Sequence, residues 1–311
     1  MARQRAPERT AMEMIIGVDF GGPRRARDQR RKIIAIGAQA IGHRRYRIAA
    51  DGINARLLSN EPPGWSAQDL LAELLGRPAR VVGFDFPFGI PDALLSDRRF
   101  AADAGFPDGA FGEWRTFAAF VAAHVPLTDP LDFSPFKAWR RSPDRPRLWT
   151  KRATDRAARA QPPLKDAFQA MFQMTLLGTA LLAKLWESHA YRVRPFPGGR
   201  GAGEVIEVYP GATLRHLGLP SYKAQPAEAI RLCITACTAA GIELDIDVRV
   251  LALCRRYNSS GPKTPDHDAA DAFVALCTAI LYAEGECREA ILHDAPAGLK
   301  EREGAIWVPR G

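Results

Sequence analysis

The sequence contains few cysteines, and their number argues against a disulfide framework. Five cysteines among 311 residues are an odd set, and four of them fall in segments with helical periodicity. We therefore expect reduced thiols. Cys233 and Cys237 have a spacing that can join a metal site on a helix, but their apolar neighbours favour core packing over zinc binding.

Long apolar runs are also missing. The longest, residues 167–183, is interrupted by Gln169 and Gln173 and falls short of the roughly 20 apolar residues that a membrane-spanning helix needs. Residues 1–12 are basic and lack the apolar centre of a secretory signal. We expect a cytoplasmic protein without a membrane partner, in which residues 167–183 form a buried helix and residues 1–12 a disordered tail.

A glycine-rich phosphate loop is absent as well. The glycines of residues 197–203 lack GxGxxG or P-loop spacing and precede a predicted strand, which favours a flexible connection over a nucleotide cradle. The charge balance is less decisive. The net charge of +8 comes from residues 1–60, where thirteen Lys and Arg face five acids. Such an excess can attract phosphate, and it fits a merely arginine-rich composition equally well.

The overall composition and the pattern of the sequence are those of a globular α/β protein. Hydrophobic residues make up 47% of the chain and charged residues 25%, enough for a large core in residues 13–311. Residues 91–164 break the alternation with many Pro, Arg and aromatic residues, so we expect a largely helical insertion there. The patterns predict strands at 14–20, 31–37, 44–50, 79–85, 191–194, 204–210 and 304–308, and helices at 66–75, 113–124, 165–189, 226–240, 245–257 and 266–284.

Acidic residues stand out by their position in these elements. Asp19 and Asp85 each follow an apolar strand, and Glu207 lies within one. A buried carboxylate is costly without an arginine, backbone N–H groups or a metal ion as its partner. Asp268 and Asp271 are three residues apart at the start of a helix, so they share a face. Acids in a first turn also stabilise a helix by capping and by the helix dipole, which is the structural alternative for this pair.

Taken together, these acids point to a metal site. Strand-borne carboxylates and a helical DxxD pair supply the oxygen ligands that one or two Mg²⁺ or Mn²⁺ ions require. Two such ions would activate a water and stabilise the leaving oxygen in the hydrolysis of a phosphodiester bond. The sequence therefore predicts a metal-dependent hydrolase.

Five segments carry a resemblance to a known family. They are GVDF at 17–20, GFDFPFGIP at 83–91, RATDRAAR at 152–159, EVYPG at 207–211 and DHDAADAF at 266–273. In this order they resemble the DUF429 family of predicted RNase H-fold nucleases, and the last segment is also similar to the final catalytic helix of RuvC-type resolvases. The resemblance implies an RNase H-like fold, with a central mixed five-stranded sheet flanked by helices and the acids gathered at one edge.

The resemblance also implies roles for the acids. Asp19 would be the central metal ligand, with Glu207 and Asp271 completing the site. Asp85 and Asp268 would be further catalytic residues. Asp85 would either bind the metal or support a tight turn. Asp268 would either be a second metal ligand or cap the helix.

Basic residues are the predicted contacts to substrate. Arg152 and Arg159 share a helical face suited to a phosphate clamp, and Arg156 lies between them. Ion pairing of these arginines with Asp155 is an equally good interpretation. His267 is a candidate proton shuttle, although a histidine beside a helix start is more often a surface residue; Lys223 and Lys263 are loop lysines that are solvated by default.

The sequence thus favours a divalent-metal-dependent nuclease with DNA or RNA as its partner. A phosphotransferase of the actin or sugar-kinase type is an alternative, but residues 17–22 lack the Thr or Ser that such phosphate loops commonly carry. A non-catalytic nucleic-acid-binding module is the other alternative, because the basic first 60 residues fit it equally well.

Overall fold

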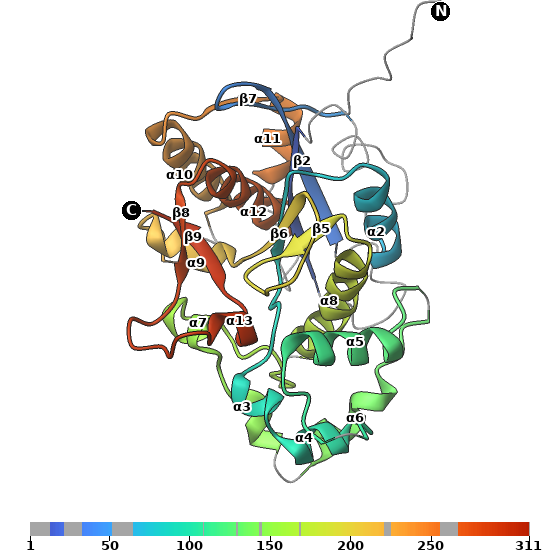
Figure 1. Ribbon diagram of the computed structural model, residues 1–311. Coiled ribbons are helices and arrows are strands. Elements are labelled where there is room, and N and C mark those ends of the chain that lie inside the picture. The colour runs from blue at the N-terminus through green and yellow to red at the C-terminus, as the bar shows by residue number, and fades with distance from the viewer. Residues whose placement is uncertain are drawn as a thin grey trace, which may run out of the picture.

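The architecture was taken from a computed structural model of the chain (Figure 1). The structure describes residues 13–21, 33–51, 65–107, 109–128, 130–142, 145–167, 169–220, 225–255 and 267–310. The predicted basic tail at residues 1–12 lies outside these ranges, as do Lys223 and Lys263.

The described strands form one mixed sheet of nine, in the order β7-β3-β2-β1-β4-β6-β9-β8, with β5 pairing with β6. The predicted five-stranded sheet is therefore too small, because strands at both edges extend it. The bounds are β1 Met14–Phe20, β2 Ile33–Gly42, β3 Arg45–Ile48, β4 Val81–Asp85, β5 Tyr191–Val193, β6 Gly203–Val208, β7 Glu243–Ile246, β8 Cys287–Ala290 and β9 Ile306–Pro309.

The centre of the sheet is where strand direction changes. β1 pairs antiparallel with β2 and parallel with β4, and β4 pairs parallel with β6. Because β1 and β4 run in the same direction, their carboxyl ends lie at one edge of the sheet, and Asp19 is the register partner of Asp85. The apolar runs that precede these two residues are buried on both faces, as expected for central parallel strands.

Helices cover both faces of the sheet (Figure 1). One face packs against α8 and α2, and the other against α12, α10 and α11. The bounds are α2 Ala67–Gly76, α3 Asp92–Leu95, α4 Arg98–Asp103, α5 Trp114–His124, α6 Lys137–Arg141, α7 Ala153–Ala157, α8 Gln169–Glu187, α9 Pro210–His216, α10 Pro226–Ala239, α11 Val248–Cys254, α12 Asp268–Ala283 and α13 Lys300–Glu303, with 3₁₀ turns η2 Ser134–Phe136 and η3 Arg145–Trp149.

The side chains of β1 show which residues face which helix. Ile16, Val18 and Phe20 belong to the hydrophobic cluster that contains the α8 residues, whereas Ile15 belongs to the cluster that contains α12. Successive strand residues point to opposite faces. Asp19, which lies between Val18 and Phe20, therefore faces α12.

Helix α12 lies unusually close to the sheet. A Cβ atom at Gly17 would stand 2.1 Å from the backbone N of Leu276, and one at Gly83 would stand 3.0 Å from the carbonyl O of Ala275. Glycine is required at position 17 because any side chain would overlap the helix backbone. This close approach fixes the first turn of α12 against the carboxyl ends of β1 and β4.

The segment predicted as an insertion, residues 91–164, contains the short helices α3 to α7 and lies below the sheet in Figure 1. The predicted helix at 245–257 begins later than expected, as α11, because Glu243–Ile246 pairs with β3 as the edge strand β7. Strand β8 and helix α9 were not predicted. Within the described ranges, no helix combines the length and apolar character needed to cross a membrane.

Candidate metal centre

Asp19 and Asp85 lie side by side where two central strands end. They are register partners on the parallel strands β1 and β4. The residues before them, Val18 and Phe84, pack in the cluster on the α8 face. By strand alternation both carboxylates therefore point to the α12 face. Asp19 is 8% exposed and Asp85 is half-buried.

Asp271 comes to the same place from α12. Helix α12 runs antiparallel to β1, and Gly17 meets the stretch from Ala272 to Leu276. Asp19 lies two residues further along the strand, which brings it level with the first turn of the helix. Asp271 occupies that turn and is 7% exposed.

Carboxylate oxygens of Asp19, Asp85 and Asp271 lie within 4.8 Å of one another, and in the described part of the chain this is the one group of three or more His, Cys, Asp or Glu with such geometry. Like charges at this spacing disfavour their common ionisation unless a cation compensates them. An arrangement of oxygen donors alone fits a hard divalent cation such as Mg²⁺ or Mn²⁺. The carboxylate triad, as we call these three residues, is therefore a candidate metal site.

Two further predicted residues, Asp268 and His267, lie at the start of α12 near Asp271. Asp268 is half-buried, one helical turn before Asp271, and is not a member of the triad. His267 precedes the helix, and its carbonyl oxygen accepts a hydrogen bond of 2.8 Å from the Asp271 N–H. At 9% exposure His267 is not the surface residue that its position in the sequence suggested.

Glu207 lies on the opposite face of the sheet. Its neighbours Ile206 and Val208 pack against α12, so the Glu207 side chain points to the α8 side. The carboxylate accepts hydrogen bonds from the two terminal nitrogens of Arg152, at 2.5 and 2.7 Å, and from the Phe88 N–H at 3.0 Å. The structure therefore corrects the assignment of Glu207 to the metal site, since its partner is an arginine.

Arg152 is the centre of a buried ion network. Its side chain is fully buried and binds Asp155 through Nη2 and Nε, at 2.7 and 3.0 Å, in addition to Glu207. Burial alone would lower the pKa of Arg152, but the Asp155 and Glu207 carboxylates outweigh it and raise that pKa above its ordinary value. Arg152 is thus a permanently charged structural residue, and its assignment to a phosphate clamp is corrected.

The three predicted clamp arginines do not lie together. Arg156 is exposed, and its guanidinium donates to the Lys151 carbonyl at 2.8 Å. Arg159 is also exposed; it follows α7 in a left-handed conformation, with φ of 50°, and lines a surface pocket. The segment that seemed to form one clamp therefore turns one arginine inward and two outward.

Sequence reasoning missed Glu303, which closes the same network. Glu303 is 5% exposed, and its carboxylate accepts the N–H groups of Asp92 and Ala153 at 2.7 and 2.8 Å. Its carbonyl accepts from Arg152 at 3.2 Å. Through these contacts it ties both ends of the helical stretch at 91–164 to the sheet. Its sequence context, Lys300-Glu-Arg-Glu303, is that of a solvated helix and gives no signal of burial.

Comparison with known proteins shows to which family the chain belongs. The family model described as "Protein of unknown function (DUF429)" matches residues 17–297. The chain belongs to the DUF429 family. All three triad residues lie within the matched DUF429 region, whereas Glu303 and β9 lie beyond its end. No curated protein and no solved structure matches the chain.

Proposed function

We propose that this DUF429 protein is a divalent-metal-dependent nuclease that hydrolyses phosphodiester bonds of nucleic acid at the carboxylate triad. The observation that carries the proposal is the convergence of Asp19, Asp85 and Asp271, with carboxylate oxygens within 4.8 Å of one another. The three residues come from two strands and a distant helix, and the close contact at Gly17 is what holds that helix in place.

The donor set fits Mg²⁺ or Mn²⁺ better than a softer metal. The triad offers carboxylate oxygens, which hard cations prefer. Cysteine ligands would favour zinc, but all five cysteines are buried in the hydrophobic cluster that contains α10 and α12, and none belongs to the triad. A bound ion of this kind supplies an activated water and neutralises the charge that develops on the phosphate.

The residues of the chain have separable tasks in this proposal. Asp19 and Asp271 are buried and would hold the ion in a fixed position, while the half-buried Asp85 would complete its coordination on the side open to substrate. Asp268 and His267, in and before the same helical turn, are candidates to orient the attacking water and to protonate the leaving oxygen.

The strand order supports the proposal. Strands β3-β2-β1-β4-β6 form an antiparallel trio followed by a parallel pair, with β1 at the centre. A mixed sheet with β1 at its centre supports the RNase H-like fold that the resemblance implies, although four further strands belong to the sheet of this chain. Fold likeness alone does not fix an activity, so the proposal depends on the triad.

A cleavage assay with separate metal titration tests the proposal. We expect the wild type to bind Mn²⁺ calorimetrically and to cut at least one member of a panel of single-stranded and duplex DNA, single-stranded RNA, RNA–DNA hybrid and four-way junction. Asp19→Asn and Asp271→Asn should lose both the binding heat and the cleavage. Asp245→Asn, which changes an exposed aspartate on β7, is the matched control and should retain both.

Two outcomes would contradict parts of the proposal. Mn²⁺ binding without cleavage of any substrate in the panel would leave a metal site and refute the nuclease. Cleavage that survives in Asp19→Asn and Asp271→Asn would place the activity away from the triad. A thermal melt of each variant separates loss of activity from loss of folding.

A further inference from the structure

The structure contains a pocket of about 500 Å³ that is separate from the carboxylate triad. Its walls come from the end of α7, from α9, from β8 and the loop after it, and from β9. None of the triad residues lines it. The volume is within the range of roughly 300 to 1,000 Å³ that is typical of ligand sites.

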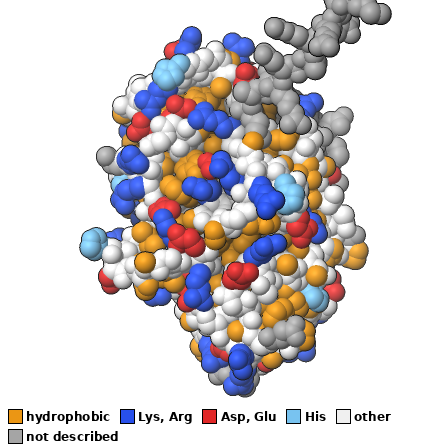
Figure 2. Space-filling view, in the orientation of Figure 1, with side chains coloured by type: hydrophobic (Ala, Val, Ile, Leu, Met, Phe, Trp, Pro, Cys, Tyr) orange, Lys and Arg blue, Asp and Glu red, His pale blue; other side chains and the backbone are white. Residues whose placement is uncertain are grey.

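The described lining of this pocket is basic and contains no acid. It includes Arg159, Arg215, Arg288, His216 and His293, and its other residues are apolar. Figure 2 shows one face of the molecule, on which Lys and Arg side chains are interspersed with Asp and Glu. A hollow lined by positive charge alone concentrates anions.

The arginines of the pocket have no carboxylate partners among the described residues, whereas many other arginines of the chain do. Arg145, for example, binds Asp166 at 2.6 Å, and Arg231 binds Glu228 at 2.5 Å. Arg159, Arg215 and Arg288 form no ion pair with the part of the chain that the structure covers. Their charges are therefore available to an external anion.

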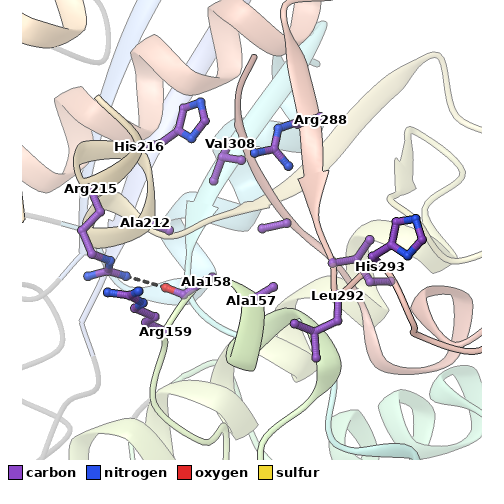
Figure 3. A pocket seen from close by; sticks show the side chains of 12 residues that line it. Ala157, Ala158, Arg159, Ala212, Arg215, His216, Arg288, Leu292, His293 and Val308 are labelled. Carbon is purple, nitrogen blue, oxygen red and sulfur yellow. Dashed lines mark hydrogen bonds between the residues drawn. The ribbon is translucent and has the colours of Figure 1, made fainter. Parts of the chain in front are cut away.

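Arg215 is held in position by the protein itself. Its guanidinium donates to the Ala158 carbonyl and stacks over the Tyr209 ring, 5.4 Å from the ring centre. In Figure 3, Arg215 and Arg159 lie on one side of the pocket, with Arg288 and His293 on the other. A side chain that is already fixed in the free protein loses less conformational entropy when a ligand binds.

His216 adds a buried polar atom to the same pocket. Its Nε2 is buried and has no hydrogen-bond partner within the described ranges. Burial, and after it the nearby positive charge of Arg288, lowers the pKa of the His216 ring. A lowered pKa favours the neutral form of the ring.

We propose that this pocket, formed by Arg159, Arg215, Arg288 and His216, binds the phosphate groups of a ligand. Guanidinium groups match the geometry of phosphate oxygens and hold them by paired hydrogen bonds. No Phe, Tyr or Trp side chain lines the described pocket to stack a nucleobase, so we assign recognition to the phosphate and not to a base. This site does not rest on the proposed nuclease activity, because none of its residues belongs to the triad.

Fluorescence anisotropy with a labelled short single-stranded DNA, measured in EDTA, tests the site without metal chemistry. The double variant Arg159→Gln/Arg288→Gln removes two exposed charges from the pocket. We expect its Kd for DNA to rise at least tenfold, and the slope of log K against log salt to shrink by about 1.4, since each single-strand phosphate contact contributes roughly 0.7. Inorganic pyrophosphate is the second probe: calorimetry measures its binding to the wild type and to the double variant, and competition in the anisotropy assay measures whether it displaces the DNA.

The matched control removes the same charge elsewhere. Arg115→Gln/Arg141→Gln changes two exposed arginines on α5 and α6 and should leave the Kd within about twofold of the wild-type value. The Asp19→Asn variant should also bind DNA normally in EDTA, which separates this site from the triad. Thermal melting of every variant verifies that it is folded.

The two probes distinguish the source of the phosphate. DNA binding that depends on Arg159 and Arg288, with or without competition by pyrophosphate, assigns the pocket to a nucleic-acid backbone. Pyrophosphate binding that depends on them while DNA binding does not assigns it to a small phosphorylated ligand. If neither probe distinguishes the pocket variant from the control variant, the proposal is overturned.

Discussion

On the α8 face of the sheet, the Glu207 carboxylate receives two hydrogen bonds from the Arg152 guanidinium. On the α12 face, Asp19, Asp85 and Asp271 bring their carboxylate oxygens within 4.8 Å of one another. Both sets are buried or half-buried at the carboxyl ends of neighbouring parallel strands. Acidic residues at the same sheet edge thus lie beside an arginine on one face and beside further acidic residues on the other.

This difference separates a structural ion network from a candidate metal site. Arg152 links Glu207 on β6 to Asp155 on α7, and through the Glu303 carbonyl to the C-terminal segment. A network with its own cation needs no ligand to be stable, and its effect is to attach the helical stretch to the sheet. The triad brings three carboxylates together, and carboxylate oxygens are the donors that a hard divalent ion prefers.

Removing Arg152 should produce the largest change in stability. Arg152→Met leaves the buried Glu207 and Asp155 without their cation, and breaking such a buried pair typically costs about 3 to 5 kcal/mol. Urea denaturation measures the free energy of unfolding. The control Arg231→Met removes an exposed ion pair with Glu228 on α10 and should show no measurable change.

A second variant sharpens this test. Adding Glu207→Gln to Arg152→Met should recover part of the lost stability, because one of the stranded charges is removed. If Arg152→Met unfolds at the same urea concentration as the wild type, the contrast between the two faces disappears.

The stabilisation of the protein by a metal ion should depend on the acids of the α12 face and not on Glu207. Mn²⁺ at a hundredfold excess over its Kd should raise the free energy of unfolding of the wild type by about 2.7 kcal/mol, because it binds only the folded state. Asp85→Asn should lose this response, whereas Glu207→Gln should retain it despite a lower starting stability. An Mn²⁺ response that vanishes in Glu207→Gln would return that residue to the metal site.

The sequence predicted the elements of the triad better than the partners of its acids. Apolar runs ending in Asp19 and Asp85 gave β1 and β4, and the DxxD pattern gave the start of α12. For Glu207 the same reasoning failed. The residues on both sides of it are apolar and buried, and a strand that is buried on both faces gives no hydrophobic pattern from which to tell which face Glu207 points to.

The arginine network was hidden for a related reason. Arg152 and Asp155 have the spacing of an exposed helical ion pair, and Glu303 lies in a charged segment 151 residues from Arg152. Only tertiary contacts bring these residues together and bury them. The helix predicted at 245–257 took in the last two residues of strand β7, Asp245 and Ile246, because pairing with β3 decides their conformation and the sequence pattern does not show that pairing.

A smaller effect should follow from changing the contact that positions Asp271. Gly17→Ala places a Cβ atom 2.1 Å from the Leu276 backbone N, so α12 must shift away from β1. Overpacking of this kind typically costs about 1 to 3 kcal/mol. The matched control is Gly76→Ala, where a Cβ would meet nothing within 4 Å. Gly17→Ala should also weaken Mn²⁺ binding in calorimetry, and unchanged stability together with unchanged Mn²⁺ affinity would refute this account of the site.

The smallest expected effect concerns the thiols of the α12 face, where all five cysteines are buried. Burial raises the pKa of Cys254 and of Cys287 to about 12. At pH 8 their thiolate fraction is then roughly one in ten thousand, so iodoacetamide should hardly modify the folded protein, with or without Mn²⁺. Because a raised pKa favours the protonated thiol, alkylation should increase as the pH approaches 12 or when urea exposes the thiols. Mass spectrometry counts the modified residues. If the native protein is labelled rapidly and Mn²⁺ prevents this labelling, the thiols are ligands of the ion. The site would then no longer be one of oxygen donors alone, separate from the buried cysteines.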